Sequence, residues 1–175
     1  MESLKKWSEN KDYESQLVVV ETESGRKQSY FVTGQKDSCD HWEVAKMVGK
    51  VKYLMIAHNH WDGGYPSVAD LWHVSGKRKG ALMNLIVSPE GITELGLMPE
   101  YPVNLSGGLR DILSGKTNAE IVDNLQLWAA VEDYIQVNNP GIKSGEIAKK
   151  FCEMLGAAIK MFSWDKKETE ELIRQ

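Results

Sequence analysis

Residues 53–60 read YLMIAHNH, an apolar run that leads directly into two histidines separated by one asparagine. The run is short and continuous, which is typical of a central strand buried on both faces. Side chains alternate along a strand, so His58 and His60 are predicted to project to the same side. Both imidazoles could then reach one metal ion at the end of this strand.

A glycine-containing loop and a helix start follow the histidines. Residues 61–66 read WDGGYP, which is loop chemistry, and Ser67-Val-Ala-Asp70 is a variant of the helix capping pattern. Two imidazole nitrogens and the Asp70 carboxylate would leave the fourth tetrahedral position of zinc for water, as in catalytic sites. We therefore predict that His58, His60 and Asp70 bind a catalytic Zn²⁺. The alternative is that the two histidines only cap, hydrogen-bond or lie at the surface.

Elements of both kinds surround this strand. β-Branched and apolar runs predict strands at 17–22, 27–33, 53–57, 81–88 and 92–97. Helical spacing predicts short helices at 41–50, with Asp40 as N-cap, and at 67–75. The polar lead-in 1–12 could form a further short helix.

The composition changes near Met98, and the chain then looks helical after a loop. Thr117-x-x-Glu120 is a capping box, and apolar residues follow it at helical spacing as far as Ile135. A second helix is predicted from Ser144, its cap, as far as Phe162. The fold class is thus α/β, with a core at residues 1–100 and a helical extension at residues 101–175.

Charge and apolar patterning exclude several classes of protein. The net charge of −4 does not favour a nucleic-acid binder, and no apolar run approaches the roughly 20 residues that span a bilayer. No signal-peptide pattern is present at the N-terminus. The two cysteines, Cys39 and Cys152, lie far apart and are interpreted as reduced thiols. We therefore expect a cytoplasmic protein.

The stretch from His58 to Asp70 resembles the JAMM (MPN-plus) metallopeptidases, whose motif is an upstream Glu, then His-x-His, then Ser-x-x-Asp. It also resembles the RadC-type bacterial proteins, which share that fold. The resemblance covers about residues 12–97. It implies a cytidine-deaminase-like, MPN-type mixed sheet flanked by helices. It also implies that His58, His60 and Asp70 bind zinc, and that Ser67 helps to stabilise the developing oxyanion.

The glutamate of this family lies just before the first strand of the core, and Glu14 occupies that place. The resemblance implies that Glu14 is the general base, which takes a proton from the nucleophilic water and gives it to the leaving amine. Glu21 and Glu23 compete for this role, but they lie beyond the strand, at the turn. The alternative is that Glu14 is a solvated residue beside a strand.

The resemblance implies a zinc metallopeptidase or isopeptidase that acts on a protein or peptide. Two features depart from the family pattern: Trp61 stands where proline is usual, and the six residues 61–66 are one fewer than usual before the serine. The alternative is therefore a non-catalytic MPN- or RadC-like scaffold. In either case residues 101–175 could dock a partner or form a homo-oligomer.

Overall fold

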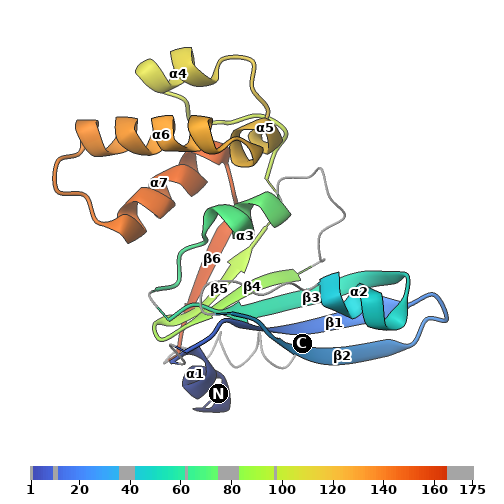
Figure 1. The fold of residues 1–175 in the computed structure, drawn as a ribbon. Coiled ribbons are helices and arrows are strands. Elements are labelled where there is room, and N and C mark those ends of the chain that lie inside the picture. Colours follow the sequence, from blue (N-terminus) through green and yellow to red (C-terminus); the bar gives the residue numbers. More distant parts are fainter. Residues whose placement is uncertain are drawn as a thin grey trace. The chain divides into compact units, whose positions relative to one another are not determined.

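The computed structural model of the chain describes residues 2–9, 12–35, 42–61, 63–74, 83–96 and 98–164. They form a mixed α/β structure of two compact units (Figure 1). The first, here called the sheet unit, comprises Met1–Gly64, Ala81–Leu95 and Lys160–Gln175. The second, the helical unit, comprises Tyr65–Gly80 and Gly96–Ile159. The units therefore interleave along the chain, unlike the sequential division at residue 100 that the sequence suggests.

A six-stranded mixed sheet, in the order β2-β1-β3-β4-β5-β6, forms the body of the sheet unit. β1 pairs antiparallel with both β2 and β3, β3 runs parallel to β4, and β4 pairs antiparallel with β5. The strands are β1 (Ser15–Thr22), β2 (Lys27–Thr33), β3 (Val51–Asn59), β4 (Met83–Ser88), β5 (Gly91–Leu95) and β6 (Ile159–Ser163). The first five confirm the strands predicted from the sequence, with small shifts at their ends.

Helices α1 (Glu2–Ser8) and α2 (Trp42–Val48) lie on opposite faces of this sheet (Figure 1). Alternation along β1 and β3 creates two apolar faces. On the face toward α2, buried Val18 and Ile56 pack with Val44. On the face toward α1, Ala57 packs in a cluster that includes Trp7. Both helices were predicted from the sequence, whereas Asp40 and Cys39 lie outside the described residues.

The helical unit contains five helices among the described residues. They are α3 (Val68–His73), α4 (Gly108–Leu113), α5 (Asn118–Asp123), α6 (Leu125–Asn138) and α7 (Ser144–Leu155). Apolar faces of α5, α6 and α7 supply buried side chains such as Ile121, Val131 and Leu155. The Trp128 and Phe151 rings stack with their centroids 3.7 Å apart. This unit therefore has a core of its own.

The prediction of one continuous helix after the Thr117 capping box is wrong. The capping box itself is present, but α5 ends at Asp123 and α6 begins two residues later. Asn124 separates them because its side-chain oxygen accepts hydrogen bonds from the N–H groups of Gln126 and Leu127, at 3.0 and 3.2 Å. An asparagine that caps a new helix N-terminus competes with continuation of the old helix.

The prediction that the last helix continues through Phe162 is also wrong. The helix α7 ends at Leu155, and Gly156 follows in the left-handed conformation, with φ of +72°. Such a glycine is a common helix stop. The chain then forms β6, in which Phe162 is buried in the same apolar cluster as Ala57. The helix also starts one residue earlier than expected, since Lys143 rather than Ser144 is the cap.

Cys152 lies in the core of the helical unit and is 1% exposed. Burial, with a further contribution from the negative charge of Asp70, raises the pKa of its thiol to about 12. Very little of the thiol would therefore carry the reactive thiolate at pH 8. We expect iodoacetamide to leave Cys152 unmodified at pH 8 in the native protein and to label it in denaturant, as peptide mapping would measure. Labelling of Cys152 at equal rates in both conditions would contradict this.

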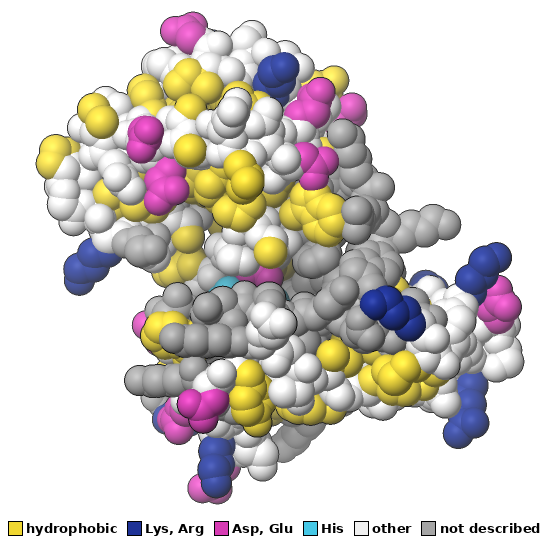
Figure 2. Space-filling model, in the orientation of Figure 1, with side chains coloured by type: hydrophobic (Ala, Val, Ile, Leu, Met, Phe, Trp, Pro, Cys, Tyr) yellow, Lys and Arg dark blue, Asp and Glu magenta, His cyan; other side chains and the backbone are white. Residues whose placement is uncertain are grey.

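The surface of the helical unit exposes several large apolar side chains (Figure 2). They include Tyr101, Val103, Leu125 and Val137.

Among the helices in the described ranges, none has the length and apolar character needed to cross a membrane.

Candidate metal centre

The two histidines of the motif lie where β3 ends. His58 is paired with Gln16 of β1 on one side and with Ile86 of β4 on the other. The N–H group of His60, just beyond the strand, still donates to the Val87 carbonyl oxygen at 2.9 Å. This bond keeps His60 in line with the strand, so that its side chain leaves the sheet on the same face as that of His58.

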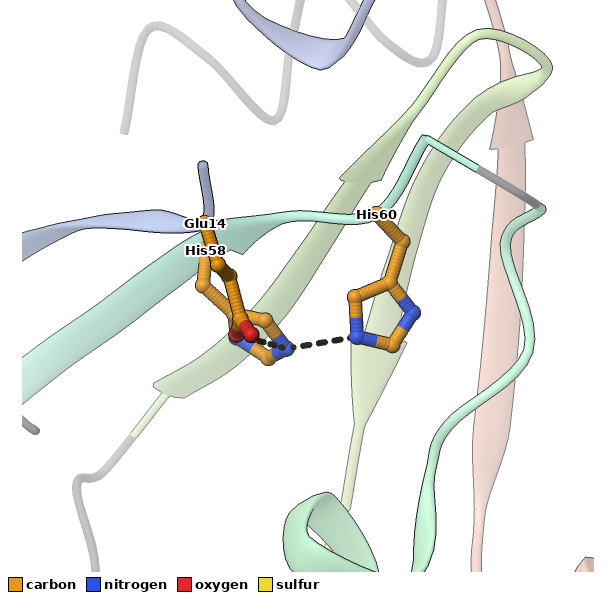
Figure 3. A group of neighbouring side chains, drawn as sticks. All are labelled: Glu14, His58 and His60. Carbon is orange, nitrogen blue, oxygen red and sulfur yellow. Dashed lines mark hydrogen bonds and ion pairs between the residues drawn. The ribbon is translucent and has the colours of Figure 1, made fainter. Parts of the chain in front are cut away.

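The two imidazoles project to the same side, as predicted from their spacing, and their rings meet edge to face (Figure 3). Their Nε2 atoms are 3.1 Å apart, and His58 is 7% exposed. Two ring nitrogens at this distance either share one proton, with one imidazole as donor, or share one cation. Neutral imidazole is the form that binds metals.

Glu14 completes a group of three potential ligands (Figure 3). Its Oε1 atom lies 4.0 Å from Nε2 of His58, and the ligand atoms of Glu14, His58 and His60 all lie within 4.8 Å of one another. Glu14 comes two residues before Gln16, the β1 partner of His58, so alternation directs it to the same face. This proximity agrees with the predicted place of Glu14 at the site and extends it, because Glu14 is close enough to be a ligand itself.

The backbone of Glu14 is tied to the chain that leaves β2. Its N–H group donates to the Gln35 carbonyl oxygen at 2.8 Å, and its own carbonyl oxygen accepts from the Gly34 N–H group at 2.9 Å. These two bonds continue the β1–β2 ladder past the last strand residue. The carboxylate is therefore presented from a fixed backbone rather than from a free loop end.

Comparisons of the chain with protein-family models, with curated proteins and with solved structures found no match. The likeness to the JAMM metallopeptidases therefore rests on the motif residues alone. Membership of that family, and the activity that it implies, stay predictions.

The loop that follows His60 is anchored at Gly64. The Thr93 hydroxyl, on β5, donates to the Gly64 carbonyl oxygen at 2.6 Å, and Thr93 is buried. A Cβ atom at Gly64 would lie 3.1 Å from the Thr93 hydroxyl oxygen and 3.2 Å from that of Ser88. The small residue thus allows the loop to lie close to the sheet. This close packing gives the predicted glycine-rich loop a structural reason.

Ser67 and Asp70, the other two predicted site residues, lie in the helical unit. They form the capping box of α3, as the sequence predicts. The Asp70 carboxylate accepts from the Ser67 N–H group at 2.6 Å and from its hydroxyl at 2.7 Å. Asp70 is buried. The group of ligand atoms described above lies in the sheet unit, so the roles of Asp70 as a zinc ligand and Ser67 as an oxyanion donor stay predictions.

The capping box allows a stability prediction for Ser67→Ala. Loss of the Ser67 hydroxyl is expected to lower the free energy of unfolding by about 0.5–2 kcal/mol, the usual cost of removing such a cap. Urea denaturation of the full chain would measure it. Thr117→Ala is the matched control, because Thr117 caps α5 with the same pair of bonds. If Ser67 also acts on substrate, only Ser67→Ala will lower turnover.

Asn59, between the two histidines, and Ser15, next to Glu14, are residues that sequence reasoning missed. Both are buried, and they are joined by hydrogen bonds on the face of the sheet opposite the imidazoles. A polar residue at the end of an apolar strand was the available signal.

Proposed function

We propose that this chain is a zinc-dependent hydrolase of peptide or isopeptide amides, built on an MPN-type fold of the JAMM kind. The observation that carries the proposal is the convergence of His58, His60 and Glu14 at one strand end, with ring nitrogens 3.1 Å apart. The motif resemblance supports it independently, because that resemblance depends on residue types and spacing rather than on the coordinates.

The donor set fits zinc in chemistry and in size. Imidazole nitrogen and carboxylate oxygen are both common zinc ligands. At zinc–nitrogen distances of about 2.0–2.1 Å, a tetrahedral ion places its nitrogens roughly 3.3–3.4 Å apart. The observed separation of 3.1 Å is within a few tenths of an ångström of that value. The distance of 4.0 Å from Glu14 to His58 suits either a ligand after a small rotation or a proton acceptor beside the ion.

The residues take distinct roles in this proposal. His58 and His60 would hold the ion, with Asp70 as the predicted third ligand. When bound, zinc supplies Lewis acidity and a nucleophilic water at neutral pH. Glu14 would accept a proton from the nucleophilic water and return it to the leaving amine. Ser67 donates to the carbonyl oxygen as negative charge develops on it.

Zinc binding is the first test of the proposal. Zinc at about 100 times its dissociation constant would stabilise the native state by about 2.7 kcal/mol. We therefore expect the melting temperature to rise by roughly 5–10 °C for a chain of this length. Calorimetry with and without Zn²⁺ would measure the shift, with EDTA to reverse it. His60→Ala is expected to remove most of the shift, and its persistence in that variant would place the ion elsewhere.

Activity is the second test, because metal binding alone does not make a hydrolase. The zinc-loaded chain would be assayed on linear peptides and on peptides joined through a lysine ε-amine, with release of the new amine as the readout. Cleavage that EDTA abolishes and Zn²⁺ restores would support the proposal. Zinc binding with no turnover of either substrate class would instead favour the scaffold alternative, which the shortened loop at residues 61–66 motivates.

A further inference from the structure

A polar contact lies on the reverse face of the sheet, behind the candidate metal centre. Asn59 follows His58 in β3, so alternation turns its side chain away from the imidazoles. The Oδ1 atom of Asn59 accepts hydrogen bonds from the N–H group of Ser15, at 2.7 Å, and from its hydroxyl, at 3.2 Å. Asn59 is 2% exposed and Ser15 is fully buried. Water therefore does not compete for these bonds.

This contact closes the ladder between β1 and β3 at the end that carries the site. The regular pairing of the two strands stops at Gln16 and His58. Beyond this pair, the Asn59 side chain takes the place of a backbone acceptor for Ser15. Helix α1 adds a third member, since Trp7 Nε1 donates to the Ser15 hydroxyl oxygen at 2.5 Å. Ser15 is thus held from two sides.

Ser15 is the residue directly after Glu14, so its anchoring determines where Glu14 stands. If the Asn59 oxygen were lost, the Ser15 N–H group would be buried without this acceptor, which is unfavourable enough to move the strand end. A displaced strand end would carry the Glu14 carboxylate away from His58. The bonds from Glu14 to Gly34 and Gln35 would remain, but they fix it to β2 rather than to β3.

We propose that Asn59 is a positioning residue, which holds Glu14 in register with His58 and His60 through Ser15. The proposal rests on the metal centre described under Proposed function. It assigns the middle residue of the His-Asn-His stretch a role toward the glutamate, in addition to its place between two ligands. Residues that orient ligands from behind in this way typically change metal affinity by 10–100-fold when replaced.

The test compares the zinc affinity of full-length variants by competition with a chromophoric chelator. Asn59→Leu keeps the approximate size and removes the acceptor, so we expect Zn²⁺ to bind about 10–100-fold more weakly where Glu14 is a ligand, and turnover at saturating Zn²⁺ to fall where Glu14 only moves protons. Asn59→Asp keeps an oxygen at the same place and is expected to stay within about threefold of the unsubstituted chain. A double variant tests whether Asn59 acts through Glu14. In a Glu14→Gln background, Asn59→Leu is expected to cause little further loss beyond that of Glu14→Gln itself.

Two further measurements distinguish a loss of positioning at Ser15 from a general loss of protein stability. Exchange of the Ser15 amide hydrogen should be faster in Asn59→Leu and slow in Asn59→Asp. Asn118→Leu is the matched control, because the Asn118 amide donates to the Pro99 and Leu155 carbonyl oxygens inside the helical unit. It should lower stability without changing zinc affinity. Should Asn59→Leu fail to fold, Asn59→Gln, which moves the acceptor by one methylene, is expected to weaken zinc binding about tenfold.

The outcomes distinguish this inference from the proposed function. Equal zinc affinity together with equal turnover at saturating Zn²⁺ in Asn59→Leu and the unsubstituted chain, or equal losses in Asn59→Leu and Asn59→Asp, would overturn the positioning role and leave the metal centre standing. Absence of zinc binding by the unsubstituted chain would overturn the metal centre and the positioning role together.

Discussion

Glu14→Gln is expected to lower turnover by about 10²–10⁴-fold at saturating zinc, the usual contribution of a general base. The amide has the shape of the carboxylate but cannot accept a proton at neutral pH. The fold should be retained, because the hydrogen bonds that Glu14 makes to Gly34 and Gln35 use only its backbone. Steady-state kinetics on the cleaved amide, with melting curves of both proteins, would measure the two effects separately.

Raising the zinc concentration distinguishes the two possible roles of Glu14, as a metal ligand or as a proton acceptor. If Glu14 acts only as a ligand, raising free Zn²⁺ until the site is filled should restore turnover in Glu14→Gln. If it moves protons, the loss should persist in the filled protein. Glu21→Gln is the matched control, since Glu21 lies at the far end of β1, opposite Lys27 and Lys52. Equal losses in the two variants would remove Glu14 from the mechanism.

The sheet side of the site could be predicted because it depends on local rules. The run at 53–57 indicates a buried strand, and the period of two places His58 and His60 on one face. Glu14 was found through the resemblance, and the antiparallel register of β1 against β3 provides the physical reason for its position. The capping boxes at Ser67 and Thr117 were also readable, since each depends on four consecutive residues.

Other features depend on contacts between residues far apart in the sequence. The apolar spacing of residues 147–162 suits a helix throughout, and only Gly156 signals the change to β6. Whether that strand exists depends on the place that β5 offers at the sheet edge, which no local pattern contains. Asn59 was missed for the same reason. Its partner Ser15 becomes visible only when β1 and β3 are placed in register.

Gly91→Ala is expected to destabilise the protein by about 3–5 kcal/mol, the range of severe core substitutions. Gly91 begins β5 with φ of +156°, a conformation that side chains rarely adopt. A Cβ atom there would lie 2.0 Å from the Phe162 carbonyl oxygen and 3.1 Å from Ser163 Cα. These are backbone atoms of β6, so no side-chain rotation relieves the overlap, and β6 itself would have to move.

Movement of β6 would disturb more than one contact. Phe162 would leave the apolar cluster beneath the sheet, and Trp164 would lose its 3.0 Å hydrogen bond to the Ser88 carbonyl oxygen. Urea denaturation would measure the loss, with Gly25→Ala as the control. Gly25 also has a positive φ, but a Cβ atom at this position would meet nothing within 4 Å, so only about 1 kcal/mol of backbone strain is expected. Similar losses of stability in the two variants would mean that the close approach of β6 to Gly91 contributes little to the free energy of unfolding.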